Sequence, residues 1–352
     1  MTIHLIYPHQ NKISAPHVIG HKLYHALKKK YEVKLYNFDE LKTIYPQQGD
    51  ILIGHPHPLP YTIFRNSIKQ KGWRKKIILA PFNCDLNQVG FINSFIDDCD
   101  QYLAITGNYW IEHILNTKIS SWHPKMRQID LAVDRNAYPF LKNHFNPPGQ
   151  RKFVYVGNDN PVKNLKYLSQ LSQALREPIA WIGKGKKVSH LLAYGMKDFS
   201  IDENRQLIAE YDFMITVGSA DANPTTILEA MSWGLIPICT PTSGYINYDG
   251  IINIPLNEPE IAINLLQDVQ FKPEQELKHL QSQGQILLRQ HFNWDRFTKQ
   301  IEDEMMSDPI PLSSVSATLT LPFHFKSKLI LFLKIIAKNT LYIFTNKYKV
   351  SK

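Results

Sequence analysis

The strongest constraint on the fold is an alternation of short apolar runs with amphipathic stretches, which begins at the N-terminus. Strand-like runs occupy 3–7, 33–38, 50–55, 75–80 and 101–106, and helix-like stretches occupy 16–30, 61–70 and 107–116. Apolar runs of this length, separated by segments of helical periodicity, predict a parallel sheet with helices on both faces.

The alternation is interrupted once and then resumes. The interruption is NHFNPPGQ (143–150), a polar stretch rich in Pro and Gly that is typical of a domain boundary. Further strand-like runs lie at 151–157, 178–183, 212–218 and 236–240, with helix-like stretches at 164–175 and 204–211. We therefore predict an α/β protein with two Rossmann-like domains facing a cleft, over 1–148 and 149–305. A linker and tail follow over 306–352.

The cysteines and the first residues bear on the compartment. Cys84, Cys99 and Cys239 form no CxxC pair, which excludes a disulfide framework or a zinc site of that spacing and favours a reducing cytosol. The opening MTIHLIYPHQ lacks a basic segment followed by a long apolar run. It therefore predicts a first strand rather than a signal peptide.

The positive charge is concentrated near the C-terminus. Of the net charge of +9, seven positive charges follow Asp308 with no acidic residue among them, which leaves +2 for residues 1–308. A nucleic-acid-binding protein more often carries its charge on the folded body, interleaved with aromatic residues. We therefore expect no nucleic acid among the partners.

The segment 328–344 has the pattern of a basic amphipathic helix. Its apolar residues fall on one broad face, and Lys334 and Lys338 lie together on the opposite face. The longest apolar run is five residues, far short of the ~20 that span a bilayer. Residues 326–352 thus predict binding to an anionic membrane surface, at the cytoplasmic face. Packing against the first domain, or against a partner, is the alternative.

The stretch SADANPTTILEAMSWGLIPICT (219–240) follows a predicted strand directly and has the signals of a short helix. Asn223 is a favoured N-cap, Pro224 suits the first helical position, and Gly234 is suited to end the helix near Trp233. In an open α/β sheet the ligand crevice lies at the carboxyl ends of the strands. The N–H groups near Thr225 and Thr226 therefore predict an anion site.

Two faces of this helix have different expected roles. Ile227, Leu228 and Met231 cluster on one face and are expected to pack on the sheet. Glu229 is the i+4 neighbour of Thr225, one turn deeper than the anion site. Its carboxylate is placed to accept hydrogen bonds from ribose hydroxyls, although an exposed glutamate on a solvated face has the same spacing.

The same stretch carries a family resemblance. Asp221, seven intervening residues and Glu229 are followed by Ala230, Met231, Gly234 and Pro237. This pattern resembles the donor-binding segment of retaining GT-B glycosyltransferases of the family 4 type, where Glu is more usual at the position of Asp221. The resemblance implies that Glu229 binds ribose and Asp221 lies near the transferred sugar, with Asn223 and Thr225 beside the phosphates or the sugar.

Two loops of the second half are similar to other family elements. Lys163 stands six residues after Gly157, as in the family's Gly-Arg-x-x-x-x-Lys turn, where the cations neutralise the leaving diphosphate. Asn158 replaces the arginine, and a solvated surface lysine is the alternative for Lys163. Gly183 and Lys184 of GKGKK (183–187) resemble the family's next glycine turn and imply donor binding, with a solvated lysine as the alternative for Lys184.

The first half resembles the family less closely. GHPHP (54–58) is similar to a His-x-His element that lines the acceptor side of the cleft, which suggests His55 and His57; satisfied loop histidines are the alternative. We predict no metal because no third ligand has zinc-like spacing. Asn83 stands where the family has a histidine near the sugar. Ser14 lies in the first loop, where the family has glycines near the donor phosphate.

The resemblance implies an enzyme that moves a sugar from a nucleotide-diphosphate sugar to an acceptor hydroxyl with retention, without a cofactor or metal. The acceptor would be a carbohydrate or a lipid-linked molecule, in synthesis of cell-surface polysaccharide or glycolipid. A catalytically impaired relative acting as a scaffold is the alternative, which the departures at Asn83 and Asn158 favour. A GT-B enzyme of other chemistry is a third possibility.

Overall fold

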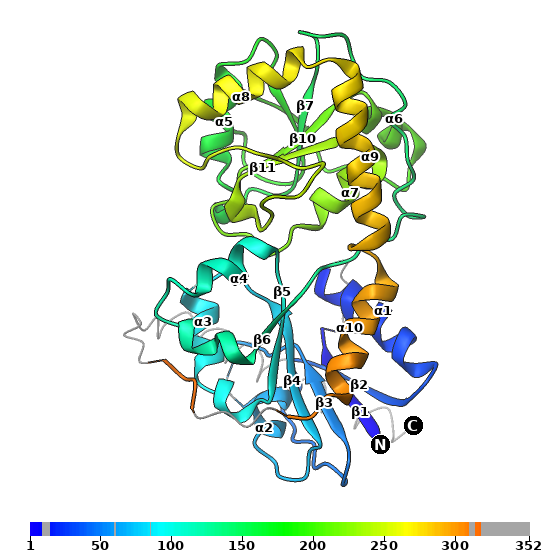
Figure 1. Cartoon of the computed structure of the whole chain (residues 1–352), viewed down its shortest axis with the longest axis vertical. Coiled ribbons are helices and arrows are strands. Elements are labelled where there is room, and N and C mark those ends of the chain that lie inside the picture. The colour runs from blue at the N-terminus through cyan, green and yellow to red at the C-terminus, as the bar shows by residue number, and fades with distance from the viewer. Residues whose placement is uncertain (9–14, 60, 85, 310–313, 318–352) are drawn as a thin grey trace, which may run out of the picture.

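A computed structural model describes residues 1–8, 15–59, 61–84, 86–309 and 314–317 (Figure 1). The first domain is a six-stranded parallel sheet in the order β2-β1-β3-β4-β5-β6. Its strands are β1 (Thr2–Tyr7), β2 (Glu32–Asn37), β3 (Ile51–Gly54), β4 (Lys75–Pro81), β5 (Gln101–Ile105) and β6 (Met126–Ile129). Its helices are α1 (Ala15–Lys28), α2 (Ile63–Ser67), α3 (Leu86–Asn93) and α4 (Asn108–Ile114), with 3-10 turns η1 (Ile96–Asp98) and η2 (Ser120–Lys125).

The second domain repeats this architecture, in the order β12-β11-β10-β7-β8-β9 and again with parallel pairs. Its strands are β7 (Phe153–Val156), β8 (Ile179–Ile182), β9 (Leu191–Gly195), β10 (Phe213–Thr216), β11 (Ile236–Cys239) and β12 (Ile252–Asn253). The helices are α5 (Leu165–Gln173), α6 (Asp202–Ala209), α7 (Thr225–Trp233), α8 (Pro259–Phe271), α9 (Glu274–Gln290) and α10 (Trp294–Met306), with turns η3 (Pro161–Lys163) and η4 (Pro241–Ser243). The predicted α/β class with two Rossmann-like sheets is confirmed.

The central strands are mostly apolar because both faces of each sheet are covered, although β1 also buries Thr2 and His4. All six residues of β1 are buried, as are all four of β3 and of β10. Parallel strands enclosed by helices on both sides require this composition. One cluster of buried side chains joins the two domains, since it runs from β1 through Leu131 and Val133 to Met214 and Phe292.

The chain passes between the domains twice, and the two passages lie together. Val133, on the outgoing passage, donates its N–H to the carbonyl of Phe292 on the return at 3.2 Å. The following helix, α10, lies within the predicted second domain by sequence but packs beside α1 of the first (Figure 1). Glu302 of α10 pairs with Lys30 at 2.9 Å.

Helix α10 begins with a side-chain cap. The side chain of Asn293 accepts a hydrogen bond from the N–H of Arg296 at 2.8 Å, so Asn293 is its N-cap.

The chain beyond α10 returns to the first domain. The Asp97 carboxylate accepts hydrogen bonds from the Ser314 hydroxyl at 2.6 Å and the Val315 N–H at 2.7 Å, and the Val315 side chain is buried. The amphipathic helix predicted within 326–352 lies outside the described residues. Within the described part of the chain, the helices are all too short or too polar to cross a bilayer.

Candidate active site

The carboxyl edges of the two sheets face each other, so the loops that follow their strands meet. The loop after β5 contacts the loops after β10 and β11: the N–H of Gly107 donates to the carbonyl of Ala222 at 2.8 Å, and that of Tyr109 to the carbonyl of Gly244 at 3.3 Å. Ligands of open α/β sheets bind at this edge. The candidate site is therefore the region between the two edges.

Lys163 and Asp221 form an ion pair at this edge. Lys163 ends the turn η3 after β7, and Asp221 lies on the loop between β10 and α7. The ammonium group contacts the carboxylate directly, and the two side chains are only 23% and 17% exposed. The structure thus brings together the two residues that the family resemblance associates with the diphosphate and the sugar.

Helix α7 has the core face that its sequence predicts. Ile227, Leu228 and Met231 are buried, and Gly234 ends the helix with φ of +91°, in the left-handed region that favours glycine. The predicted N-cap at Asn223 is wrong, because the helix begins at Thr225 and the capping residue is Pro224, with ψ of 123°. Asn223 instead accepts a hydrogen bond from the Tyr245 hydroxyl at 2.6 Å.

Glu229 is not the solvated surface residue that the alternative predicted. Its carboxylate is hydrogen bonded to Thr225, as the i+4 spacing suggested, and to Tyr138 from the segment that joins the domains. Burial raises the pKa of Glu229, and these two hydrogen bonds act in the opposite direction. A largely buried carboxyl group is thus held at the base of the α7 N-terminal turn.

Glu229 lines a pocket of about 430 Å³ between the domains. Its walls come from α1, the segment 131–138, α7 and the start of α10. The lining residues are Ala15, Val18, Ile19, Lys22, Leu131, Ala132, Val133, Asp134, Ala137, Tyr138, Thr225, Glu229 and Trp294. Lys22 and Asp134 pair across one wall at 2.7 Å. The pocket therefore combines apolar walls with a few fixed polar groups, as small-molecule sites do.

Trp294 is a pocket residue that the sequence analysis did not assign. Its indole Nε1 is buried and has no acceptor among the described residues, although the residue lines the pocket. An indole N–H only donates, and a buried donor without an acceptor is unfavourable. The signal available in the sequence was its position just after the N-cap Asn293, which placed it in a helix but not in a site.

Gly157 and Gly183 bring two loops of the second domain into close contact. A Cβ on Gly183 would lie 1.8 Å from the carbonyl oxygen of Gly157, so only glycine fits there. Asn158 turns its side chain to its own loop, where Oδ1 accepts from the N–H of Asn160 at 3.1 Å. Lys184 is exposed to solvent. These residues share the sheet edge with Lys163, whereas Ser14 lies outside the described residues.

Asn83 reaches across the domain boundary. Its Nδ2 donates to the carbonyl of Ala220 at 2.9 Å, so this amide holds the second domain's loop beside Asp221. No charge is present at the position where the resembling family has a histidine. Thr226, by contrast, stands in the first turn of α7 as predicted, next to Thr225.

His55 and His57 lie in the first domain and do not line the pocket beside Glu229. Nδ1 of His55 donates to the carbonyl of Pro56 at 3.0 Å, and burial lowers the pKa of His55 to about 4. Nδ1 of the buried His57 accepts from the N–H of Leu59 at 3.1 Å. His55 is therefore neutral near pH 7, and both rings are held by their own loop.

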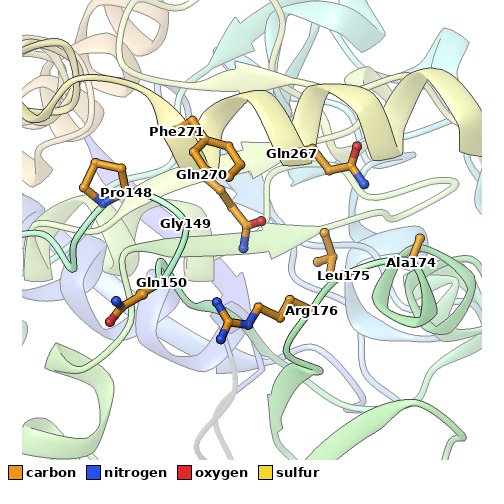
Figure 2. A pocket seen from close by; sticks show the side chains of 9 residues that line it. All are labelled: Pro148, Gly149, Gln150, Ala174, Leu175, Arg176, Gln267, Gln270 and Phe271. Carbon is orange, nitrogen blue, oxygen red and sulfur yellow. The ribbon is translucent and has the colours of Figure 1, made fainter.

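Another hollow, of about 550 Å³, lies in the second domain away from this edge (Figure 2). Three segments line it: residues 148–150 before β7, residues 174–176 after α5, and the end of α8. The last of these contributes Gln267, Gln270 and Phe271 (Figure 2). These segments belong to the amino edge of the second sheet. The hollow is thus separated from Asp221 by the length of the strands.

The two facing six-stranded sheets define the GT-B fold, and solved glycosyltransferases of that fold are similar to this chain. Anabaena HepE in complex with UDP and glucose has 12% identity and a TM-score of 0.55, over 87% of this chain and 99% of that one. Sucrose-phosphate synthase of Thermosynechococcus elongatus has 10% identity and a TM-score of 0.62, over 86% and 98%.

A further similar structure is S. aureus TarM in complex with fondaparinux, α-GlcNAc-glycerol and UDP. Its identity is 11% and its TM-score 0.54, and the match covers 73% of this chain but only 55% of TarM. The sequence matches no protein-family profile and no curated protein. The likeness in all three cases concerns the fold.

Proposed function

We propose that this chain is a retaining glycosyltransferase that moves a sugar from a nucleoside-diphosphate sugar to an acceptor hydroxyl. The observation that carries the proposal is the Lys163–Asp221 ion pair at the sheet edge next to the N-terminus of α7. It supplies a cation, a carboxylate and free N–H groups at one place. The complexes of HepE and TarM with UDP make a uridine nucleotide the first candidate ligand.

The leaving diphosphate needs preorganised positive charge. Lys163 would supply a full charge, and the first N–H groups of α7, near Thr225 and Thr226, have no intrahelical acceptor and carry the positive end of the helix dipole. Such groups stabilise charge as it develops on the leaving group. Asp221 would contact the transferred sugar once the diphosphate has drawn Lys163 toward itself.

The pocket beside Glu229 would hold the ribose. The Glu229 carboxylate would accept hydrogen bonds from ribose hydroxyls, and the indole N–H of Trp294 would gain an acceptor. Gly157, Asn158, Gly183, Lys184, Asn223 and Ser14 complete the proposed donor site, and His55 and His57 the acceptor side. Retention would follow from front-face attack, in which the leaving phosphate accepts the proton of the acceptor hydroxyl.

The remaining expectations stay proposals. They are a family 4 mechanism without a cofactor or bound metal, a carbohydrate or lipid-linked acceptor, no nucleic acid partner, and binding of the cytoplasmic membrane face through 326–352. Among the described residues, no three His, Cys, Asp or Glu side chains are grouped to hold a metal ion. Metal independence itself is tested by adding a chelator to the transfer assay.

A catalytically impaired scaffold is the second candidate, and two contacts favour it. The Asn83 amide is engaged by the Ala220 carbonyl, and Asn158 is turned toward Asn160. Neither residue contributes the charge that the resembling enzymes have at these positions. A scaffold of this kind would bind a nucleotide weakly or not at all and would transfer no sugar.

Thermal unfolding of the full chain with UDP, GDP, ADP and their sugars tests the proposal. A ligand at 100 times its dissociation constant adds about 2.7 kcal/mol of stability. At roughly 2–4 °C per kcal/mol, the unfolding midpoint should rise by several degrees with one nucleotide series. Glu229→Gln, which removes the charge but preserves the shape, should lose most of that rise.

The control is Glu276→Gln. It removes an exposed carboxylate at the start of α9, which pairs with Lys272 and does not line the pocket. It should leave the rise intact. If the midpoint of the folded wild type rises with none of the nucleotides, the donor site is wrong and the scaffold is the better account. If a nucleotide binds but no nucleotide-sugar is consumed, the nucleotide site is supported and the sugar-transfer activity is refuted.

A further inference from the structure

The loop that carries Asp221 is held by the opposite domain. Three consecutive carbonyls, those of Ala220, Asp221 and Ala222, each accept a hydrogen bond from the first domain. The donors are Nδ2 of Asn83 at 2.9 Å, Nε1 of Trp110 at 2.7 Å and the N–H of Gly107 at 2.8 Å. Asn83 lies on the loop after β4, Gly107 on the loop after β5, and Trp110 in the first turn of helix α4 that follows.

Contacts within the second domain hold the same loop from its other side. The N–H of Ser219 donates to the carbonyl of Val162 at 2.8 Å, and the N–H of Asp221 donates to the carbonyl of Thr242 at 2.9 Å. The Ser219 bond links the Asp221 loop directly to the turn that ends at Lys163. The loop is thus fixed between its own domain and the first domain, and its Asp221 carboxylate contacts Lys163.

A second pair of bonds locks the two domains beside this loop. Nδ2 of Asn108 donates to the carbonyl of Ile246 at 2.7 Å, and its Oδ1 accepts from the N–H of the same residue at 3.0 Å. Gly107 touches the backbone of Gly244 so closely that a Cβ on Gly107 would lie 1.7 Å from the Gly244 oxygen. The contact therefore tolerates no added atom at this point.

From these contacts we propose that Asn83, Gly107 and Trp110 are positioning residues that set the Asp221 carboxylate relative to Lys163. The inference rests on the proposed function, in which Asp221 contacts the sugar. It assigns to Asn83 a backbone-holding role in place of direct sugar contact. It also means that the first domain contributes to chemistry on the donor, not only to acceptor binding. None of these three residues lines the pocket proposed to hold the ribose, so donor affinity should not depend on them.

Trp110→Phe removes the indole donor and keeps a large ring. Its matched control is Trp122→Phe, because Trp122 is also buried in the first domain and its indole N–H donates to Oδ1 of Asn93 at 3.1 Å, away from the domain contact. Gly107→Ala is the second variant. Its φ of −80° and ψ of 164° suit alanine, so the methyl group acts only on the neighbouring domain.

The first measurement is hydrogen exchange of the amides in 219–223 of the full chain without ligand. Both variants should exchange at least tenfold faster there, and Trp122→Phe should not.

The second measurement is the release of nucleotide from UDP-glucose, GDP-mannose and ADP-glucose in water. In this hydrolysis the bond between the sugar and the diphosphate breaks, water adds its hydroxyl to the sugar, and its proton leaves with the diphosphate. A displacement of about 1 Å is worth about 100-fold in rate, so kcat should fall about 10- to 100-fold. The Kd for the nucleotide should change less than twofold.

Unchanged exchange at 219–223 in both variants overturns the inference, whatever the activity. Faster exchange with unchanged kcat also overturns it, because the loop would then be free to move without consequence for the reaction. A proportional loss of nucleotide affinity and kcat overturns it as well, since that is the signature of general destabilisation. If the wild type neither binds nor consumes a nucleotide-sugar, the proposed function fails, and the exchange experiment alone decides whether the first domain holds the loop. Should Gly107→Ala fail to fold, Trp110→Phe decides.

Discussion

Replacing Asp221 by asparagine should strengthen nucleoside-diphosphate binding while abolishing sugar transfer. In the unliganded protein the Asp221 carboxylate neutralises Lys163. A diphosphate must compete with that carboxylate for the lysine and also approach its negative charge. Asparagine keeps the shape and the backbone carbonyl that Trp110 contacts, but it removes both obstacles.

The magnitude follows from Coulomb's law. A carboxylate about 6 Å from a phosphate charge, at an effective dielectric constant of about 40 for a site one-fifth exposed, is repelled by 332/(40 × 6), or about 1.4 kcal/mol. That corresponds to about tenfold in affinity. Lys163→Met should act in the opposite direction, because it removes the attracting charge, and it should weaken binding about tenfold or more. Uridine, which lacks phosphate, should bind both variants as it binds the wild type.

Isothermal titration of UDP and uridine into the three proteins at fixed salt measures these differences. Glu302→Gln is the control, because it breaks the Lys30–Glu302 pair, whose carboxylate is similarly buried, outside the candidate site. It should lower stability and leave UDP affinity unchanged. The reasoning is refuted if Asp221→Asn binds UDP no more tightly than the wild type, since the carboxylate would then not compete with the phosphate.

Three other predictions concern stability. Burial lowers the pKa of His55 to about 4, below the unfolded value of about 6.5, so the unfolded state takes up a proton first as the pH falls. The free energy of unfolding should therefore decrease by about 2–3 kcal/mol between about pH 6.5 and about pH 4. Urea titrations of His55→Asn should show a flatter pH dependence, and an unchanged slope would contradict this. In Gly234→Ala, the alanine would have to adopt the left-handed φ of +91°, with its Cβ 2.7 Å from the Phe140 ring. The free energy of unfolding in urea should therefore fall by about 1–2 kcal/mol. An unchanged urea midpoint would count against this. Asn293→Ala should cost about 1 kcal/mol, and Asn293→Asp, which still accepts from the Arg296 N–H, should cost clearly less by the same measurement.

The fold was predictable where strands are enclosed on both faces. Runs such as Ile51–Gly54 contain only apolar residues and glycine and are fully buried, and the spacing of such runs is enough to indicate a parallel sheet. Strand β9 was not predicted, because only Leu191 of its five residues is buried at the edge of the sheet. Helices α8 and α9 were also not assigned, although their ends lie at proline-containing turns that such an analysis can use.

The site was predictable where the chain itself determines geometry. The end of α7 at Gly234 and its buried face follow from helical spacing and from the freedom of glycine at positive φ. The hydrogen bonds of Asn223, Glu229 and Asn83 could not be predicted in this way. Their partners, Tyr245, Tyr138 and Ala220, lie 22, 91 and 137 residues away, and only the tertiary packing of the chain brings them together. Local sequence carries no signal for such contacts.

The double passage of the chain makes the second domain an insertion. The segment that leaves the first domain and the segment that returns to it are joined by the Val133–Phe292 hydrogen bond, and α10 then completes the surface of the first domain. Cutting the chain once at 148 would strip the first domain of its last helix and leave the α1 side of its core uncovered. Excising the span between these two adjacent points, in contrast, removes the donor half as one module. A chimaera that exchanges donor specificity should therefore be joined at both points, as one would replace a long loop.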